Sequence, residues 1–476
     1  MKLIHTSRQF IGGNTIFLAL VMTALVGLVL ACYLNLVHSQ NYSTMRSQAW
    51  NSSIPIVEAG LEEALSHLNT HGSTNLLCDG WTFTSGKYVM QRSIGSNYYV
   101  VSITNFVAGI TNLAPIIESR GFVVLPVLTA SGAGPVFATA GVAQPVSQFM
   151  GRGVRVNTRL DLIFTKGMVA KDQIDMNGNN ISSNSFDSSD PNYSTGGAYD
   201  PSKVKDNGDI ATNSTLTNSV NVGNANIYGK VSTGPNGTVA VGSQGAVGSK
   251  AWQNAANKGV QPGWVDDDMN VDFPEVKLPF NGGYFAPGSV TVNGTNYDYV
   301  LTGGNYQMSS LSMSSSAKMY ITGDAVLYVT GDFSMTGQSS IQLASGASLK
   351  LYVGGASGAI GGNGIVNSGN SSKFIYYGLP SNTSLSFDGN ATFTGVIYAP
   401  NAAFALNGGG NRGRDYSYDF IGASVTKSVR LNGHYSFHYD EALAKNGPFR
   451  SYIINGWNEM TPEEVAAVPV IYHNYY

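Results

Sequence analysis

The sequence predicts a mainly β protein with a long N-terminal helix, a small α+β domain and a right-handed parallel β-helix or similar solenoid. Three observations carry this prediction. An uncharged apolar stretch lies near the N-terminus, short β-prone runs alternate with glycine-rich turns over most of the chain, and only 12% of the 476 residues are charged. Soluble domains usually carry about twice that share of charge, and here Gly, Ser, Thr and Asn take its place.

The composition also disfavours several classes of protein. The balance of 26 Lys and Arg against 29 Asp and Glu does not promise the basic face that nucleic-acid binding needs. The 26 Tyr and 20 Phe argue against a disordered chain, and two cysteines are too few for a disulfide scaffold. What remains is a weakly charged, turn-rich β protein that is long enough for two or three domains.

The N-terminal apolar stretch is long enough to span a membrane. Residues 14–45 contain no Asp, Glu, Lys or Arg, and Ile16 to Val37 are almost wholly apolar. As a helix these residues would span roughly 33 Å, which covers a hydrocarbon core. The predicted membrane-spanning segment therefore includes Ile16, Leu25, Cys32 and Val37. Cys32 is expected as a free, buried thiol, because a helix of membrane length separates it from Cys78.

The basic residues predict the orientation of this helix. Lys2 and Arg8 precede it and the next basic residue is Arg46, which places the N-terminus in the cytoplasm and the bulk of the chain outside a single-pass inner-membrane helix. A cleaved secretory signal is the rival interpretation, but its apolar region would be about 7–15 residues long and followed by small residues at a cleavage site.

The helical pattern continues beyond the membrane-length segment. Val57, Leu61, Ala64 and Leu68 recur on one helical face, so residues 14–72 are predicted to form a transmembrane helix and an amphipathic extension after a leader at 1–13. Pro55 is expected to kink or break the helix.

Short strands are predicted to follow in residues 73–159. A helix with a few antiparallel strands gives a small α+β domain, and Gly95 to Asn97 supply a turn signal between two of the strands. The candidate strands are 88–90, 98–103, 116–123 and 152–159, and residues 125–146 are expected to form a loop.

From about Leu160 to Leu443 the pattern is that of stacked coils. Brief apolar strands alternate with tight glycine-rich corners and there is hardly any helix signal, which favours a parallel β-helix. A β-sandwich is the rival architecture. Residues 444–476, with a helix start at Pro462, are expected to form a C-terminal cap or tail for the solenoid.

The N-terminus resembles a known family. The leader ends at Gly12 and Gly13, and the amphipathic extension reads VEAGLEEAL over residues 57–65. This is similar to the N-terminus of type IV pilin-like proteins, particularly PilX-type minor pilins and pseudopilins. The resemblance implies that a prepilin peptidase cuts after Gly13 and leaves Asn14 as the first mature residue. The family often carries Glu at the fifth mature position, where this chain has Leu18, which fits a minor, tip-like or priming subunit better and leaves an uncleaved anchor as an alternative.

The long C-terminal region resembles a β-helical domain of unassigned role that is found fused to pilin-like N-termini in bacterial surface proteins. The similar motifs are Asn177–Asn179 with Asn184–Ser188, Gly395–Ala402, Asp419–Ala423 and Gly433–Leu443. They say little about activity.

Candidate chemical sites are few. On a strand, His434, His438 and Asp440 would point to one face and could hold zinc, but they are interpreted as lining the outer face of the last coil and closing the solenoid end. The carboxylate cluster Asp266–Asp268 lacks the spacing and the glycine of a calcium loop and is interpreted as a solvated linker.

An enzymatic role would need carboxylates brought together across the fold. Asp324, Asp332 and Asp388 are candidates, although each stands beside a glycine and reads as a turn residue. No catalytic residue, metal or cofactor is therefore predicted.

The sequence predicts a non-catalytic, membrane-anchored surface protein, a minor pilin-like subunit that displays a β-helical domain for adhesion or assembly. The alternative is a membrane-anchored β-helical carbohydrate-active enzyme or glycan-binding protein. The expected partners are the membrane, other pilin-like subunits or a secretion or pilus assembly machine, and a surface glycan or protein ligand.

Overall fold

The chain folds into two compact units. The computed structural model describes residues 13–71, 76–107, 114–125, 149–178, 180–389, 393–407 and 420–468. Unit 1 comprises residues 1–161 and 451–476, and unit 2 comprises residues 162–450. Unit 2 is thus inserted into unit 1 along the sequence. Both units are rich in strands, and a long apolar helix begins the described chain. The predicted leader before Gly13 and most of the loop predicted at 125–146 lie outside the described residues.

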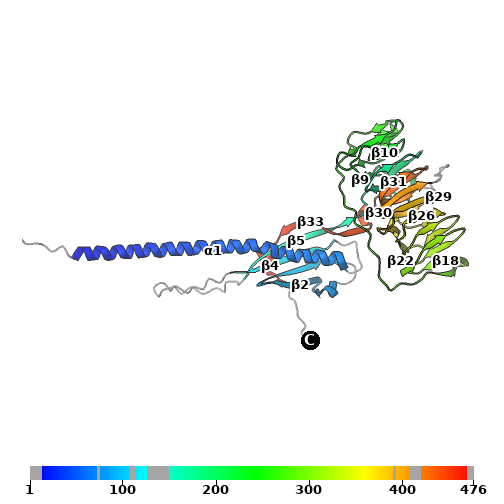
Figure 1. Ribbon diagram of the computed structural model, residues 1–476. Helices are drawn as coiled ribbons and strands as arrows, with labels where there is room; N and C mark the ends of the chain where they lie inside the picture. Colours follow the sequence, from blue (N-terminus) through cyan, green and yellow to red (C-terminus); the bar gives the residue numbers. More distant parts are fainter. Residues whose placement is uncertain are drawn as a thin grey trace, which may run out of the picture. The chain divides into compact units, whose positions relative to one another are not determined.

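Helix α1 (Gly13–His71) is continuous through Pro55, so the expected break is wrong. Its first part is exposed and its second part contacts strands of unit 1 (Figure 1). Ser53, Ile56 and Val57 are buried around the proline. Because this stretch packs against the sheet, the packing offsets the cost of about 3 kcal/mol or more that proline imposes on a helix interior.

The sheet of unit 1 contains the four predicted strands and two more. The order in the described residues is β1-β2-β3-β4-β5-β33, and the first five strands pair antiparallel. The strands are β1 (Thr82–Thr84), β2 (Lys87–Ile94), β3 (Asn97–Thr104), β4 (Ile116–Val124), β5 (Phe149–Leu162) and β33 (Phe449–Glu459), and a 3₁₀ helix, η1 (Leu76–Asp79), precedes them. The turn predicted at Gly95 joins β2 and β3.

Most of the residues predicted as a C-terminal cap or tail belong to unit 1. Strand β33 extends the sheet of unit 1 beside β5, and α4 (Pro462–Ala466) begins at the predicted proline. Val465 and Met460 pack against Phe122 of β4, and Gly121, the neighbour of Phe122, faces α1. Successive residues of a strand point to opposite faces, so α1 and the C-terminal segment cover opposite faces of the sheet. The open edge of β5 offers unpaired backbone groups that β33 satisfies.

Unit 2 is built from short strands that pair in parallel, in most cases with the third strand along the chain. Strands β18, β21, β24 and β27 pair in succession, as do β19, β22, β25 and β28, and also β20, β23, β26 and β29. The strands of this part are β17 (Gly288–Val292), β18 (Thr295–Leu301), β19 (Gly304–Met308), β20 (Leu311–Met313), β21 (Lys318–Ile321), β22 (Asp324–Val329), β23 (Phe333–Met335), β24 (Ser340–Leu343), β25 (Ser348–Val353), β26 (Ser357–Gly362), β27 (Ile365–Asn367), β28 (Phe374–Gly378), β29 (Ser384–Gly389), β30 (Phe393–Asn407), β31 (Phe420–Leu431) and β32 (Ser436–Asp440).

The first strands of unit 2 lie in the middle of this succession. β31 pairs with β6 and β7, and β32 pairs with β8. From there the pairing continues from β6–β8 to β9–β11 and on to β12–β14 and β16. These strands are β6 (Met168–Ala170), β7 (Ile174–Asp175), β8 (Ser182–Phe186), β9 (Ile210–Thr212), β10 (Val220–Gly223), β11 (Asn226–Ile227), β12 (Val231–Ser232), β13 (Val239–Val241), β14 (Ala246–Val247), β15 (Gly259–Val260) and β16 (Val265–Asp266), with the short helix α2 (Lys250–Asn254) between β14 and β15.

Residues 267–287, here called the return segment, connect β16 at one end of this succession to β17 at the other. Phe273 and Val276 of the return segment are buried against a row of aromatic and aliphatic side chains that includes Tyr398 and Val425. The Tyr398 hydroxyl donates a hydrogen bond to the Pro274 carbonyl oxygen at 2.7 Å. The return segment therefore covers the outer side of one row of strands.

The interior of unit 2 is filled by inward-facing apolar residues in register. Phe393, Phe420 and Phe437 stack with ring centroids 4.5 Å apart at each step, and all three are fully buried. The alternating burial of β22 and β25 agrees with one face inward and one outward.

Candidate functional site

The exposed part of α1 is the most apolar surface of the described chain. Ile16 is 72% exposed and Leu25 is 51% exposed. Cys32 is a free thiol that is exposed on this surface, so its expected burial within the chain is wrong; Val37 is half-buried. Among the helices that the structure describes, α1 alone is long and apolar enough to cross a membrane. Its most apolar part is not buried by the protein. Such a surface in water would be strongly unfavourable.

The predicted processing residues stand at the start of this helix. Gly13 and Asn14 are the first two residues of α1, and their side chains lie outside the described residues. Leu18, which occupies the position where the resembled family often has Glu, is exposed. The peptide bond after Gly13 therefore lies at the N-terminal end of the apolar helix.

The second part of α1 approaches the sheet closely because each side of the contact carries a glycine, Gly60 on the helix and Gly121 on β4. A Cβ atom at Gly121 would lie 2.8 Å from the backbone nitrogen of Val57, and a Cβ at Gly60 would lie 2.5 Å from the Ser119 hydroxyl oxygen. The Ser119 hydroxyl donates a hydrogen bond to the Val57 carbonyl oxygen at 2.7 Å. Any side chain at either glycine would push the helix from the strands.

Charged contacts fix the same half of the helix. Glu63 accepts a hydrogen bond from the Tyr99 hydroxyl and forms an ion pair with Arg92. Burial and the hydrogen bond to Glu63 raise the pKa of Tyr99 above its ordinary value. Glu63 lies outside the row formed by Val57, Leu61, Ala64 and Leu68, and its carboxylate joins the helix to the sheet through these partners.

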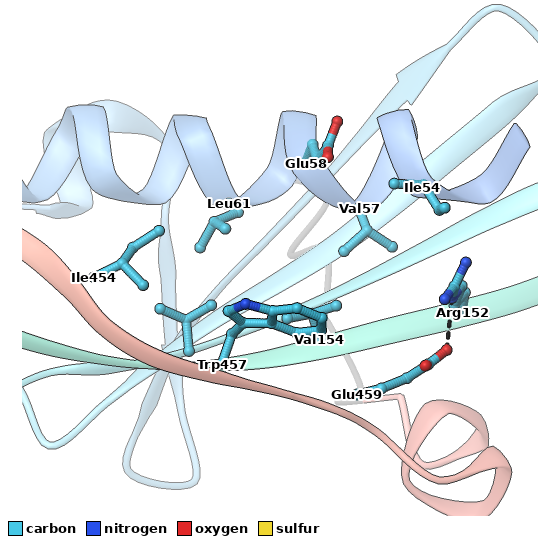
Figure 2. A pocket seen from close by; sticks show the side chains of 10 residues that line it. Ile54, Val57, Glu58, Leu61, Arg152, Val154, Ile454, Trp457 and Glu459 are labelled. Atoms are coloured by element: carbon cyan, nitrogen blue, oxygen red, sulfur yellow. Dashed lines mark hydrogen bonds and ion pairs between the residues drawn. The ribbon is translucent and has the colours of Figure 1, made fainter. Parts of the chain in front are cut away.

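A groove lies beside α1 on the face of the sheet that the helix covers (Figure 2). It has a volume of about 280 Å³ and a mainly apolar lining. Trp457 of β33 is 66% exposed there, and an ion pair of 2.6 Å between Arg152 and Glu459 lies at one side. The full lining is Ile54, Val57, Glu58, Leu61, Arg152, Val154, Val156, Ile454, Trp457 and Glu459.

The opposite face of the sheet holds a buried ionic cluster that the sequence analysis missed. Glu118 of β4 contacts Arg120 at 3.0 Å and Arg155 at 2.9 Å. Arg155 also pairs with Glu464 of α4. Burial raises the pKa of Glu118, but the hydrogen bonds from Arg155 and Arg120 outweigh this effect and hold it below its ordinary value. Basic residues that alternate with apolar ones in 152–159 indicate a strand with charged side chains. The sequence does not indicate which acidic residues pair with them.

His438 and Asp440 do not close the end of unit 2 as expected. They lie on β32, which pairs on both sides, with β31 and β8, and both are buried rather than on an outer face. The His438 Nδ1 atom lies 2.7 Å from the Asn184 Oδ1 atom, and the Tyr199 ring stacks on the imidazole at 3.7 Å. His434 is only half-buried. The segment between β8 and β9, which includes Tyr199, covers this part of β32.

The carboxylates proposed for an enzyme are engaged in separate contacts between neighbouring strands. Asp324 accepts a hydrogen bond from Ser348, and Asp332 accepts one from the backbone of Ser357. Asp388 accepts one from Asn407. Among the described residues, no three His, Cys, Asp or Glu side chains gather as metal ligands. Each of these aspartates therefore has a structural contact with a residue about 20 to 25 positions later in the chain.

The predicted linker acids are in contact with solvent. Asp266 at the end of β16 and Asp267 and Asp268 at the start of the return segment are exposed, and Asp266 lies 3.7 Å from Lys230. The solvated interpretation of this cluster agrees with their exposure.

The chain is similar to one protein family in part of unit 2 and to a solved pilin structure. A family model described as a domain of unknown function (DUF7305) matches residues 281–446, which lie within unit 2. No curated protein matches the sequence. Among solved structures, the crystal structure of the competence-associated pilin ComZ from Thermus thermophilus is similar, with 11% identity over 87% of this chain and 97% of that chain and a TM-score of 0.31. A TM-score this low does not establish a shared fold.

Proposed function

We propose that this chain is a membrane-anchored minor pilin-like subunit that carries its large β unit outside the cell. The observation that carries this proposal is α1, a single 59-residue helix. Its first part exposes a membrane-length apolar surface, and its second part is built into a folded sheet. A cleaved secretory signal would be followed by small residues at a cleavage site, whereas one helix runs here from the apolar stretch into the packed part.

The proposed maturation is cleavage after Gly13 by a prepilin-type peptidase. Asn14 would then begin the mature chain at the start of the apolar helix. Leu18 in place of the usual Glu fits a subunit that occurs in few copies, at a tip or in priming. The N-terminus is proposed to lie in the cytoplasm and the rest of the chain outside the inner membrane, as the basic residues before the helix predict.

Unit 2 is proposed to be a parallel β-helix that serves adhesion or assembly rather than catalysis. Support comes from the parallel pairing of every third strand, the inward apolar rows and the separate structural contacts of the candidate carboxylates. Its proposed partners are other pilin-like subunits, an assembly machine, and a surface glycan or protein.

The mature N-terminus tests the proposal most directly. The full chain is expressed with and without a prepilin peptidase, extracted from membranes, and its N-terminal peptide is identified by mass spectrometry. An N-terminus at Asn14 only in the presence of the peptidase is expected. An intact N-terminus under both conditions leaves a plain anchor, and a cut after the apolar stretch contradicts membrane anchoring.

The two cysteines provide a test of orientation. Cys78 lies outside α1 and is exposed, whereas Cys32 lies within the apolar segment. In the Cys32→Ser variant, a membrane-impermeant maleimide is expected to label Cys78 in spheroplasts without lysis. The Cys78→Ser variant serves as the matched control and should label only after detergent is added. Labelling of Cys78 that requires lysis would reverse the proposed orientation.

A further inference from the structure

We propose that unit 2 is assembled from two half-stacks of unequal stability, and that the first folds only when the last strand of the second pairs with it. The first half-stack comprises residues 162–266 and the second comprises residues 288–445. They meet where β31 and β32 pair with β6, β7 and β8. The return segment connects their far ends.

The first half-stack has weak coils of its own. Strands β7, β11, β12, β14, β15 and β16 each contain two residues. In the second half-stack, β22, β25, β26 and β29 each contain six. In a stacked architecture the stability is approximately a sum of what each coil contributes and what each contact between neighbours contributes. Backbone hydrogen bonds outside these strands also join the layers of the first half-stack, for example from Tyr228 to Ser183. Its regular strand ladders are shorter than those of the second half-stack, so its layers depend more on the contact with a stable neighbour.

The contact between the half-stacks is unusually polar and well partnered. The Glu441 carboxylate accepts hydrogen bonds from Ser185, Lys205 and Asn207. These three partners belong to the first half-stack, more than 230 residues earlier in the chain. Because charge-assisted hydrogen bonds are stronger than neutral ones, Glu441 links the last turn of the second half-stack to two segments of the first.

Two further carboxylates extend this set of contacts. The Asp187 carboxylate, which is almost fully buried, lies 2.5 Å from the Lys445 ammonium group. The Asp440 carboxylate accepts hydrogen bonds from the backbone nitrogen and the hydroxyl of Ser188, at 3.0 and 2.8 Å. Both carboxylates are buried, and a change of register would leave them without these partners. Residues 436–445 therefore set the position of the first half-stack.

The return segment cannot replace this contact. It hydrogen-bonds to the first half-stack through Asn213 and Val271, and to the second through Tyr398 and Pro274. Both sets of contacts lie along one outer side. The return segment therefore contacts both half-stacks along their outer side. The strand pairing that completes the first half-stack comes from β31 and β32.

This order of folding has a consequence for export, which rests on the proposed function. A chain that crosses the membrane with its N-terminal helix anchored delivers residues 162–266 well before residues 436–445. The first half-stack then stays open until transport of the second is complete. Because β32, the strand that stabilises the first half-stack, stands near the end of unit 2, the first half-stack does not fold into a compact domain before transport is complete.

Hydrogen exchange with mass spectrometry on the purified full chain tests the dependence without reference to export. In Glu441→Gln, residues 210–247, which do not contain the contacts of Glu441, are expected to exchange about tenfold faster or more. Residues 299–353 of the second half-stack are expected to keep their exchange rates. Ser185→Ala is a milder variant of the same contact, and a smaller effect with the same distribution is expected there.

Lys230→Met is the matched control, because Lys230 pairs with Asp266 at the far end of the first half-stack. It should leave residues 210–227 unchanged. The proposal is overturned if exchange in Glu441→Gln rises only in peptides next to position 441, rises equally in both half-stacks, or does not rise. None of these outcomes depends on membrane anchoring or on cleavage after Gly13.

Discussion

The contact between α1 and its sheet predicts a large effect from the smallest possible substitution. In Gly121→Ala, the new Cβ atom would lie 2.8 Å from the Val57 backbone nitrogen and 3.0 Å from the Ser53 carbonyl oxygen. Both are backbone atoms of a helix, so neither moves without moving the helix. Overpacking of this kind costs about 1–3 kcal/mol. Gly60 lies on the helix side of the same contact. In an exposed helix, replacing glycine by alanine would normally stabilise the protein by up to about 1 kcal/mol.

The assay is hydrogen exchange of the strand peptides in detergent-solubilised full chain. A loss of about 1–3 kcal/mol corresponds to roughly 5–150-fold faster exchange in β3 and β4. Gly60→Ala is also expected to accelerate exchange, because its Cβ would lie 2.8 Å from the Tyr99 ring and this clash outweighs the gain in helix propensity. Gly456→Ala is the matched control, since no atom lies within 4 Å of its added Cβ. Unchanged exchange in Gly121→Ala would refute the close approach of helix and sheet.

Three further predictions concern ionic and capping contacts. Glu118→Gln leaves the buried Arg120 guanidinium without its carboxylate partner, while Arg155 keeps Glu464; it is expected to destabilise unit 1 by about 3 kcal/mol, measured as a shift in urea-induced unfolding of that unit. Hydrogen bonds from Lys445 and Ser189 outweigh the effect of burial and lower the pKa of Asp187; the stability gained is present above the unfolded pKa and lost as the pH falls through the folded pKa. Asp187→Asn should therefore lower the melting temperature of unit 2 at pH 7, with a difference that shrinks below about pH 4; a constant difference would contradict the ionic contribution. Thr461→Ala removes the capping box of α4 and is expected to cost about 1 kcal/mol, seen as faster exchange in residues 462–466.

Local patterns predicted the elements of unit 1 well. The strands around Val89, Val101 and Ile117 were found because each is rich in β-prone residues, and the turn signal at Gly95 separates the first two. The apolar face of the helix extension was read from its spacing, and Val57, Ala64 and Leu68 are buried. These are local properties, since one element and its immediate turn determine them.

Long-range partners were not predictable in the same way. Nothing near β33 in the sequence indicates that it pairs with β5, because the two strands are separated by the whole of unit 2. The error over Pro55 has the same origin: a local rule gave a break, and packing on the sheet prevented it. His438 and Asp440 were placed at an end because they come late in the chain, whereas the strand that carries them has partners on both sides.

The position of the few charges in unit 2 follows from its architecture. Parallel strands that pair in register place equivalent positions next to one another, and like charges in adjacent strands would repel. Rows of Ser, Asn and Tyr avoid this repulsion, as in the Ser312–Ser334 and Tyr352–Tyr377 neighbours. A junction between segments that are distant in sequence has a different requirement, because it must exclude other registers. Opposite charges such as Asp187 and Lys445 meet that requirement, since a shift by one residue would bury a carboxylate without its partner. The neutral rows within unit 2 and its charged junction are therefore two consequences of the same parallel pairing.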